Sequence, residues 1–233
     1  VIRCSMELGG NAPVIVLDDA NIQTAVSGII LAKMRNGGAA CTSANRIFVQ
    51  KGIAEEFLAA FTKAMDAFVM GRGTDQGVTL GAYVSLKERD KIAALVDEAI
   101  KSGASVRTGG KKPDGPGAFY PATVMTVDKY NSILKHEIFG PVAPIVIFDT
   151  DEEGIALAND TEFGLISYVF SGELGRAIRT AEAMESGMVA INKGVISDPA
   201  APFGGVKQSG LGREGGFDGI HEFLETKYIG FDL

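Results

Sequence analysis

The sequence has no tryptophan, only two cysteines and only two histidines among its 233 residues. Two thiols, Cys4 and Cys41, are too few for the disulfide framework that stabilises small secreted proteins. Their small number predicts a reducing compartment, and we expect the cytoplasm. With His136 and His221 as the only imidazoles and no cluster of cysteines, no zinc site is predicted.

Basic residues and long apolar runs are also scarce. Lys and Arg number 22 against 29 Asp and Glu, so the net charge is −7. A chain of this charge without a basic cluster is not expected to bind nucleic acid or an anionic membrane surface. No run of about 18 apolar residues occurs, so no transmembrane helix is predicted. What is present, 46% hydrophobic residues and 30 scattered glycines, is typical of a globular protein.

Short β-rich runs alternate with segments of helical periodicity. Strands are predicted over 13–17, 46–50, 105–108, 120–127, 142–148, 165–170 and 188–192, and helices over 18–34, 53–69, 86–102, 150–159 and 174–184. Asp18 and Asp19 are expected to cap the first helix. This alternation predicts an α/β fold with an open, mainly parallel sheet flanked by helices.

The end of the chain has a different character from the rest. Glycines are frequent over 199–219, which predicts ordered loops there. A helical turn is expected over 220–224 and a last strand over 226–231. Residues 210–215 match the pattern G-x-G-x-x-G, but no apolar strand precedes them, so a dinucleotide-binding loop is not predicted.

Cys41 is the first candidate for chemistry. Small residues surround it in the segment NGGAACTSAN, so a substrate could approach the sulfur. Access of this kind is what a nucleophilic thiol needs. The alternative is that Cys41 is a small buried hydrophobic residue, as free cysteines often are.

Glu7 is the second candidate. It stands between Met6 and Leu8 and is followed by two glycines. A carboxylate in such surroundings suits a partly desolvated general base, although a surface glutamate at a strand end is the simpler alternative. Between Glu7 and Cys41 the sequence holds one strand, one helix and a glycine loop, a unit that can return the chain to its starting point.

Five segments, in this order, resemble motifs of the aldehyde dehydrogenase superfamily. They are ELGGNAP (7–13), GAAC (38–41), EIFGP (137–141), PFGG (202–205) and KQSGLGRE (207–214). The resemblance extends from Met6 almost to the end of the chain and is closest to succinate-semialdehyde dehydrogenases. Ala39 departs from the family, which commonly has glutamine there, and Ser43 takes a place where some members have a second cysteine.

The resemblance implies a thiol mechanism that uses both candidates. Cys41 would attack the aldehyde carbon, and the adduct would pass a hydride to the nicotinamide of NAD or NADP. Glu7 would then activate the water that hydrolyses the thioester. Members that transfer the acyl group to coenzyme A usually lack this glutamate, so Glu7 favours the hydrolytic branch.

The resemblance also implies a cofactor site around Leu8, Gly9, Glu137 and Phe139. Glu137 would hold the hydroxyls of the nicotinamide-side ribose, which suits a carboxylate acceptor. Phe139 would limit where the nicotinamide lies. Without the resemblance, Phe139 would be interpreted as an ordinary core aromatic.

Three residues are implied on the substrate side. Arg35 and Ser197 stand where succinate-semialdehyde dehydrogenases bind the distal carboxylate, and a guanidinium with a hydroxyl suits that group. Phe203 would form a wall of the aldehyde pocket. The alternative for Arg35 is a solvated residue that complements the helix dipole.

The chain begins with Val1 and is about half as long as a family enzyme, so we expect a fragment. Residues 1–13 would end the cofactor-binding region, 14–219 would form the catalytic domain, and 220–233 would be an oligomerisation segment. The parent is expected to be a homodimer or homotetramer, and the isolated chain to oxidise little aldehyde. Two alternatives remain open: a cysteine-dependent acyl-transfer hydrolase, which would want a histidine near the thiol, and a non-catalytic interaction module.

Overall fold

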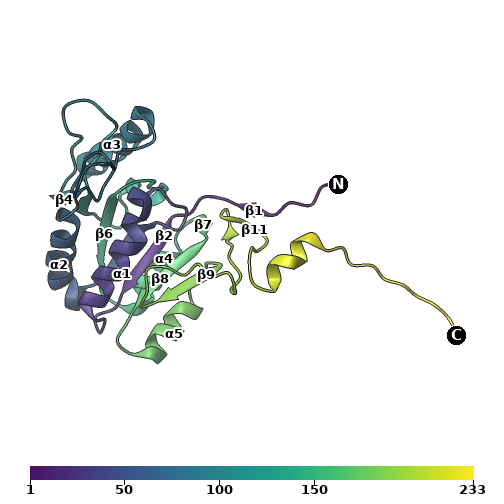
Figure 1. Cartoon of the computed structure of the whole chain (residues 1–233). Helices are drawn as coiled ribbons and strands as arrows, with labels where there is room; N and C mark the ends of the chain where they lie inside the picture. The colour runs from purple at the N-terminus through teal and green to yellow at the C-terminus, as the bar shows by residue number, and fades with distance from the viewer.

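In the computed structural model, which describes residues 1–233, seven strands form one sheet in the order β4-β5-β6-β3-β2-β8-β9 (Figure 1). These strands are β2 (Ala12–Val16), β3 (Ala44–Gln50), β4 (Ser105–Thr108), β5 (Thr123–Thr126), β6 (Val142–Phe148), β8 (Ile166–Phe170) and β9 (Met188–Ile191). Every neighbouring pair is parallel except β4 with β5. The prediction of a mainly parallel α/β sheet is therefore confirmed.

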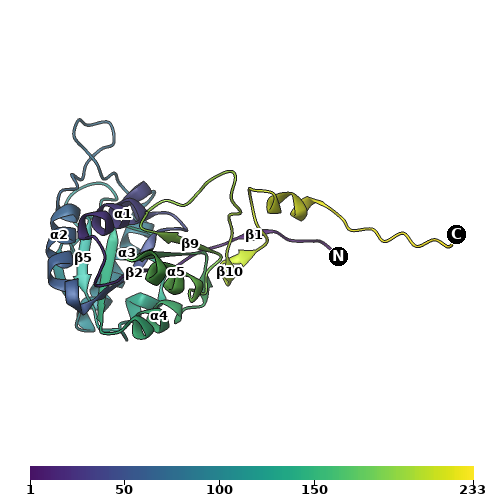
Figure 2. The same ribbon diagram turned by 90° about the horizontal axis from the view of Figure 1, so that it is seen from below.

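Helices cover both faces of this sheet. They are α1 (Ile22–Met34), α2 (Ala54–Asp66), α3 (Leu86–Lys101), α4 (Asp151–Asn159) and α5 (Leu174–Glu182). Alternate residues of a strand point to opposite faces, so Val14 packs in the core formed with α1 and α2, whereas Ile15 packs in the core formed with α3, α4 and α5. Figure 2 shows α1 and α4 on opposite sides of the strands. Burial on both faces explains the continuous apolar runs of the central strands.

The first helix begins later than predicted. Asn21 is its N-cap and accepts a hydrogen bond from the Thr24 amide at 2.9 Å. Asp18 instead pairs with Arg176 at 2.7 Å, and Asp19 accepts hydrogen bonds from Ser171 and the Glu173 amide. The expected cap at Asp18 and Asp19 is wrong because partners distant in the sequence engage both carboxylates.

The predicted strand over 226–231 is also wrong for this single chain. Residues 225–233 have no regular structure, and Figure 1 shows the end of the chain extending away from the sheet. A strand needs hydrogen-bonding partners along its edge, and no segment of the chain supplies them. The predicted strand over 120–127 is shortened to Thr123–Thr126, because Pro121 has no amide to donate.

The glycine-rich region over 199–219 is an ordered loop system, as predicted. It contains two short strands: β10 (Val206–Lys207) pairs with β7 (Phe163–Gly164), and β11 (Gly210–Leu211) pairs with β1 (Met6–Glu7). A 3-10 helix over Asp218–Phe223 takes the place of the predicted turn. The G-x-G-x-x-G segment at 210–215 thus starts in a strand pair and opens no α-helix.

Three segments that carry candidate residues lead into neighbouring strands of the sheet at their amino ends. Residues 7–10 lead into β2, Cys41 leads into β3, and residues 137–141 lead into β6. These three strands are parallel and adjacent or separated by one neighbour, so their amino ends lie together. No helix of the chain combines the length and the apolar character needed to cross a membrane.

Candidate active site

Glycines let three segments pack closely together at the amino ends of the strands. The Glu137 carboxylate accepts a hydrogen bond from the Gly10 amide at 3.0 Å. A Cβ atom at Gly9 would lie 2.9 Å from Glu137 Oε2, and one at Gly10 would overlap the carbonyl oxygen of Cys41. Only residues without a side chain allow Glu137 and Cys41 to pack against the strand that leads from Glu7.

Glu7 is held by the pairing of β1 with β11, in which it lies opposite Gly210. Both carboxylate oxygens are buried and have no hydrogen-bond partner. Burial raises the pKa of Glu7, the negative charge of Glu214 raises it further, and Arg213 opposes the shift. A desolvated carboxylate without a partner, with its pKa raised, has the properties of a general base.

Cys41 lies at the end of a tight turn that follows α1. Asn36, Gly37 and Gly38 have φ values of 53°, 61° and 81°, so three consecutive residues are left-handed. A side chain at Gly38 would also overlap the carbonyl oxygen of Gly140. The turn therefore places the loop that carries Cys41 in close contact with the segment that carries Glu137.

The surroundings of Cys41 favour the neutral thiol. Burial raises its pKa most, and the negative charges of Glu7 and Glu137 raise it further. The backbone amides of Cys41 and Thr42 act in the opposite direction. The thiol of the resting chain therefore keeps its proton, which has to leave when the sulfur attacks. Glu7 and Glu137 thus both lie near enough to the thiol for their charges to act on it.

Glu137 and Phe139 border a large cavity. Its volume is about 720 Å³, and Ala39, Tyr83 and Pro141 contribute to its wall. Phe139 is 45% exposed, so one side of its ring is free to contact a ligand. A cavity of this size fits part of a nucleotide cofactor.

Leu8 and Gly9 are anchored beside Glu137 through one serine. The Leu8 amide donates to the Ser209 carbonyl at 3.0 Å, and the Ser209 hydroxyl donates to the Gly9 carbonyl at 2.7 Å. Ser209 is fully buried. The backbone that the resemblance assigns to the cofactor is thus rigid where it passes Glu137.

The predicted substrate residues are placed less closely together. Arg35 is exposed, and its Nη2 donates to Thr42 Oγ1 at 3.0 Å. Phe203 packs, like Cys41, against the edge of the α1–α2 core. Ser197 is exposed and makes no hydrogen bond to Arg35. A shared role of Arg35 and Ser197 stays a prediction.

Sequence reasoning missed two buried residues that hold the segment after Cys41. Lys33 is completely buried, and its Nζ donates to Asn45 Oδ1 at 2.8 Å and to Ser43 Oγ at 3.3 Å. The Tyr168 hydroxyl donates to the Thr42 carbonyl at 2.7 Å. The helical spacing of Val26, Ile29 and Lys33 was a signal for Lys33, because it places this residue on the buried face of α1.

Lys33 has no carboxylate partner, and burial lowers its pKa to about 7. In the unfolded chain its pKa returns to about 10.5, so between these values the unfolded state binds the extra proton. We therefore expect the free energy of unfolding to rise with pH from about 7 to 9, by at most about 1.4 kcal/mol per pH unit. Urea titrations over this range measure the slope.

Lys33→Met should flatten this dependence, whereas Lys63→Met, which changes an exposed lysine of α2, should not. An equal pH slope in wild type and Lys33→Met would contradict the assignment of the slope to Lys33.

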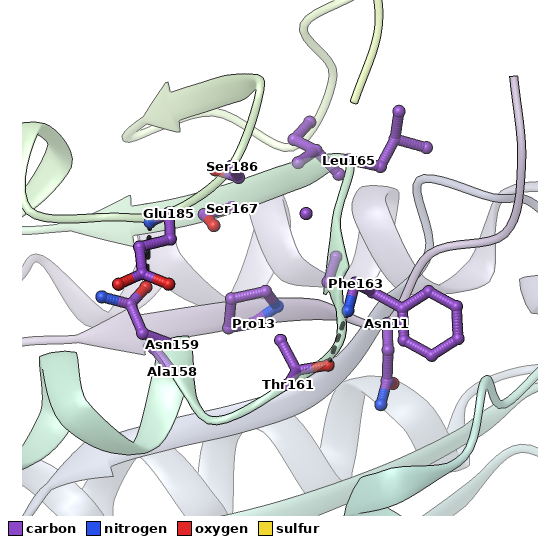
Figure 3. Close-up of a pocket in the computed structure, with 13 residues that line it drawn as sticks. Asn11, Pro13, Ala158, Asn159, Thr161, Phe163, Leu165, Ser167, Glu185 and Ser186 are labelled. Carbon is purple, nitrogen blue, oxygen red and sulfur yellow. Dashed lines mark hydrogen bonds between the residues drawn. The ribbon is translucent and has the colours of Figure 1, made fainter. Parts of the chain in front are cut away.

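A second cavity, shown in Figure 3, lies between β2, β8 and the end of α4. Polar side chains, among them Asn11, Thr161 and Ser167, form part of its wall. Its volume is only about 10 Å³, which is enough for roughly one water molecule. It cannot hold an aldehyde or a nucleotide, so it is not a candidate active site.

Comparison with known proteins agrees with this geometry. The model of the Aldehyde dehydrogenase family matches residues 1–229. Succinate-semialdehyde dehydrogenase of Paenarthrobacter nicotinovorans is 53% identical over 231 residues, which are 99% of this chain and 51% of that protein. Glutarate-semialdehyde dehydrogenase of Pseudomonas putida is 45% identical, over 97% of this chain and 47% of that protein.

A solved structure gives the same picture. The crystal structure of an E. coli NADP-dependent enzyme superposes with a TM-score of 0.93 at 45% identity, covering 97% of this chain and 47% of that chain. The chain thus spans about half the length of the curated relatives it matches.

Proposed function

Because the chain belongs to the aldehyde dehydrogenase family, we propose that it is the catalytic part of an NAD(P)-dependent enzyme that oxidises a semialdehyde to an acid. Succinate semialdehyde is the preferred candidate substrate. One observation supports this proposal: Gly10, three residues after Glu7, donates its amide to Glu137 and packs against the Cys41 carbonyl, so the segments of the three groups meet at one end of the sheet. The domain boundaries at residues 13 and 219 remain part of the proposal.

Cys41 is proposed to form the covalent intermediate. Its sulfur adds to the aldehyde carbon as the thiol proton passes to the carbonyl oxygen, and this hydroxyl proton goes to water when the hydride leaves. The backbone amides of Cys41 and Thr42 favour negative charge on the sulfur. When bound, NAD or NADP accepts the hydride that this oxidation releases. The acyl group is then held on Cys41 as a thioester.

Glu7 is proposed to complete the reaction. Its unpaired carboxylate takes a proton from water, and the resulting hydroxide attacks the thioester carbon. The C–S bond breaks, the acid leaves, and Cys41 recovers its proton. Because its pKa is raised, Glu7 loses activity as the pH falls through a value above that of an ordinary glutamate.

The nicotinamide end of the cofactor fits the residues that are present. Glu137 accepts one hydrogen bond from Gly10 and keeps Oε2 available for a ribose hydroxyl. Phe139 offers an exposed ring face to the cavity of about 720 Å³. Leu8 and Gly9 supply a rigid backbone beside them. These residues do not distinguish NAD from NADP.

Arg35 is proposed to bind the distal carboxylate, with Ser197 and Phe203 completing the pocket. In the full-length enzyme, Arg35→Met should lower kcat/KM for succinate and glutarate semialdehydes by roughly 10- to 100-fold, because a charged hydrogen bond is lost. Uncharged aldehydes should react as before. A substrate panel measured against Arg72→Met, which changes an exposed arginine, tests this proposal.

An equal loss for all aldehydes would contradict the carboxylate role of Arg35.

We further propose a reducing compartment such as the cytoplasm, supported by the two free thiols, and a homo-oligomeric parent.

The two alternative functions have less support. An acyl-transfer hydrolase needs a histidine at the thiol, but His136 and His221 are exposed and their rings make no hydrogen bond. An interaction module has no use for a buried, unpaired Glu7, which lowers stability.

A further inference from the structure

Arg35 has one fixed contact and several free donors. Its only side-chain hydrogen bond runs from Nη2 to Thr42 Oγ1 at 3.0 Å, and no carboxylate lies within 4.0 Å of its charged nitrogens. A guanidinium has five N–H donors arranged in a plane. One bond therefore sets the direction of the plane, and the other donors stay available for an anion.

Thr42 is a rigid acceptor for this bond. Thr42 is only 5% exposed, and its carbonyl accepts a hydrogen bond from the Tyr168 hydroxyl at 2.7 Å. Tyr168 itself is 2% exposed in the middle of β8. The next residue, Ser43, is fixed as well: its amide donates a hydrogen bond to the Ala40 carbonyl, and its hydroxyl accepts one from Lys33 Nζ. A β-branched side chain on so fixed a backbone has little rotational freedom.

The contact lies directly beside the nucleophile. The left-handed turn over Asn36, Gly37 and Gly38 folds Arg35 back onto the residue that follows Cys41. Tyr168, whose hydroxyl bonds the Thr42 carbonyl, belongs to the same core against which Cys41 packs, so Thr42, Tyr168 and Cys41 lie together.

We propose that Thr42 is a positioning residue that selects aldehydes with a distal carboxylate. Its hydroxyl holds the Arg35 guanidinium beside Cys41, so that the free N–H groups meet the carboxylate of an aldehyde bound at the sulfur. This inference rests on the proposed function, because it assumes that Arg35 receives the substrate. Without the hydroxyl, an exposed arginine samples many rotamers and has to be ordered when the substrate binds.

The test uses a reaction that the chain can perform without a cofactor. An aldehyde adds reversibly to the Cys41 thiol: an S–C bond forms, the carbonyl π bond breaks, and the thiol proton moves to the oxygen. No oxidant is required. The adduct protects Cys41 from iodoacetamide, and in a Cys4→Ser background Cys41 is the only thiol left. The concentration that halves the labelling rate is measured for succinate semialdehyde and for butanal.

Wild type should be protected by succinate semialdehyde at lower concentration than by butanal. Thr42→Val keeps the shape but not the acceptor, and should need about tenfold more succinate semialdehyde with no change for butanal. Thr42→Ser, which keeps the hydroxyl, should restore most of the preference. Thr108→Val makes the same change on β4, far from Cys41 in the sheet, and should behave as wild type.

Two outcomes overturn the role of Thr42 alone: Thr42→Val still prefers succinate semialdehyde as wild type does, or it loses protection by both aldehydes equally. If wild type itself shows no preference, the carboxylate role of Arg35 is overturned, and the role of Thr42 with it. If Thr42→Val does not fold, as judged by thermal unfolding, Thr42→Ala removes the same acceptor with less crowding and decides the question.

Discussion

Replacing Glu7 with glutamine in the full-length enzyme is expected to slow steady-state oxidation by about 10²- to 10⁴-fold, the range that general-base catalysis contributes. Glutamine cannot take a proton from water, so the thioester on Cys41 should accumulate after one turnover. Rapid mixing should show one equivalent of NAD(P)H formed quickly, followed by a very slow phase. Mass spectrometry of the quenched enzyme should find the acyl group on Cys41.

The same variant should make Cys41 more reactive toward iodoacetamide. The negative charge of Glu7 raises the pKa of the thiol, so its removal lowers that pKa and increases the thiolate fraction at neutral pH. Faster alkylation together with slower turnover separates a catalytic role from damage to the fold. Glu98→Gln, on the far end of α3, is the matched control and should change neither rate. Slow turnover without an acyl-enzyme would be evidence against Glu7 as the base for hydrolysis.

The 233-residue chain alone, mixed with NAD or NADP and succinate semialdehyde, is expected to turn over at least about 10³-fold more slowly than the full-length enzyme. The cofactor contacts proposed above, Glu137, Phe139 and the cavity beside them, would hold only the nicotinamide end. The glycine-rich segment 210–215, which could suggest a phosphate loop, begins with β11 (Gly210–Leu211), which pairs with β1, and opens no α-helix. A weakly held cofactor is not aligned with the adduct on Cys41.

Absorbance of NADH or NADPH measures this turnover, and iodoacetamide labelling of Cys41 in the same sample shows that the thiol remains accessible. Turnover by the chain alone at a rate close to that of the full-length enzyme would refute the expectation.

Much of the fold could be predicted from local patterns. Local apolar patterns identified the seven strands of the main sheet and the five helices. Burial of one stripe imposes the helical period, and burial on both sheet faces gives the central strands continuous apolar runs. Element ends were less accurate. The start of α1 at Asn21 depended on Arg176 and Ser171, which engage Asp18 and Asp19 from more than 150 positions away.

For the candidate site, too, the sequence could predict some features and not others. Small or unusual neighbours singled out Cys41 and Glu7 within a few consecutive residues, whereas Glu137 was implied only by the resemblance of its segment to a family motif. The environment of each group was not visible. The sequence gives no sign that burial and two carboxylates raise the pKa of Cys41 and favour the neutral thiol.

The sequence by itself determined the class of fold, the family and the residue types available for chemistry. The tertiary structure decided which of these residues interact: that Lys33 is buried without a counter-charge, that Thr42 receives Arg35, and that residues 226–231 have no strand partner within the chain. The physical reason is that periodicity and turn preference act over a few neighbouring residues. Desolvation, charge interactions and hydrogen-bond partners depend instead on segments that only folding brings together.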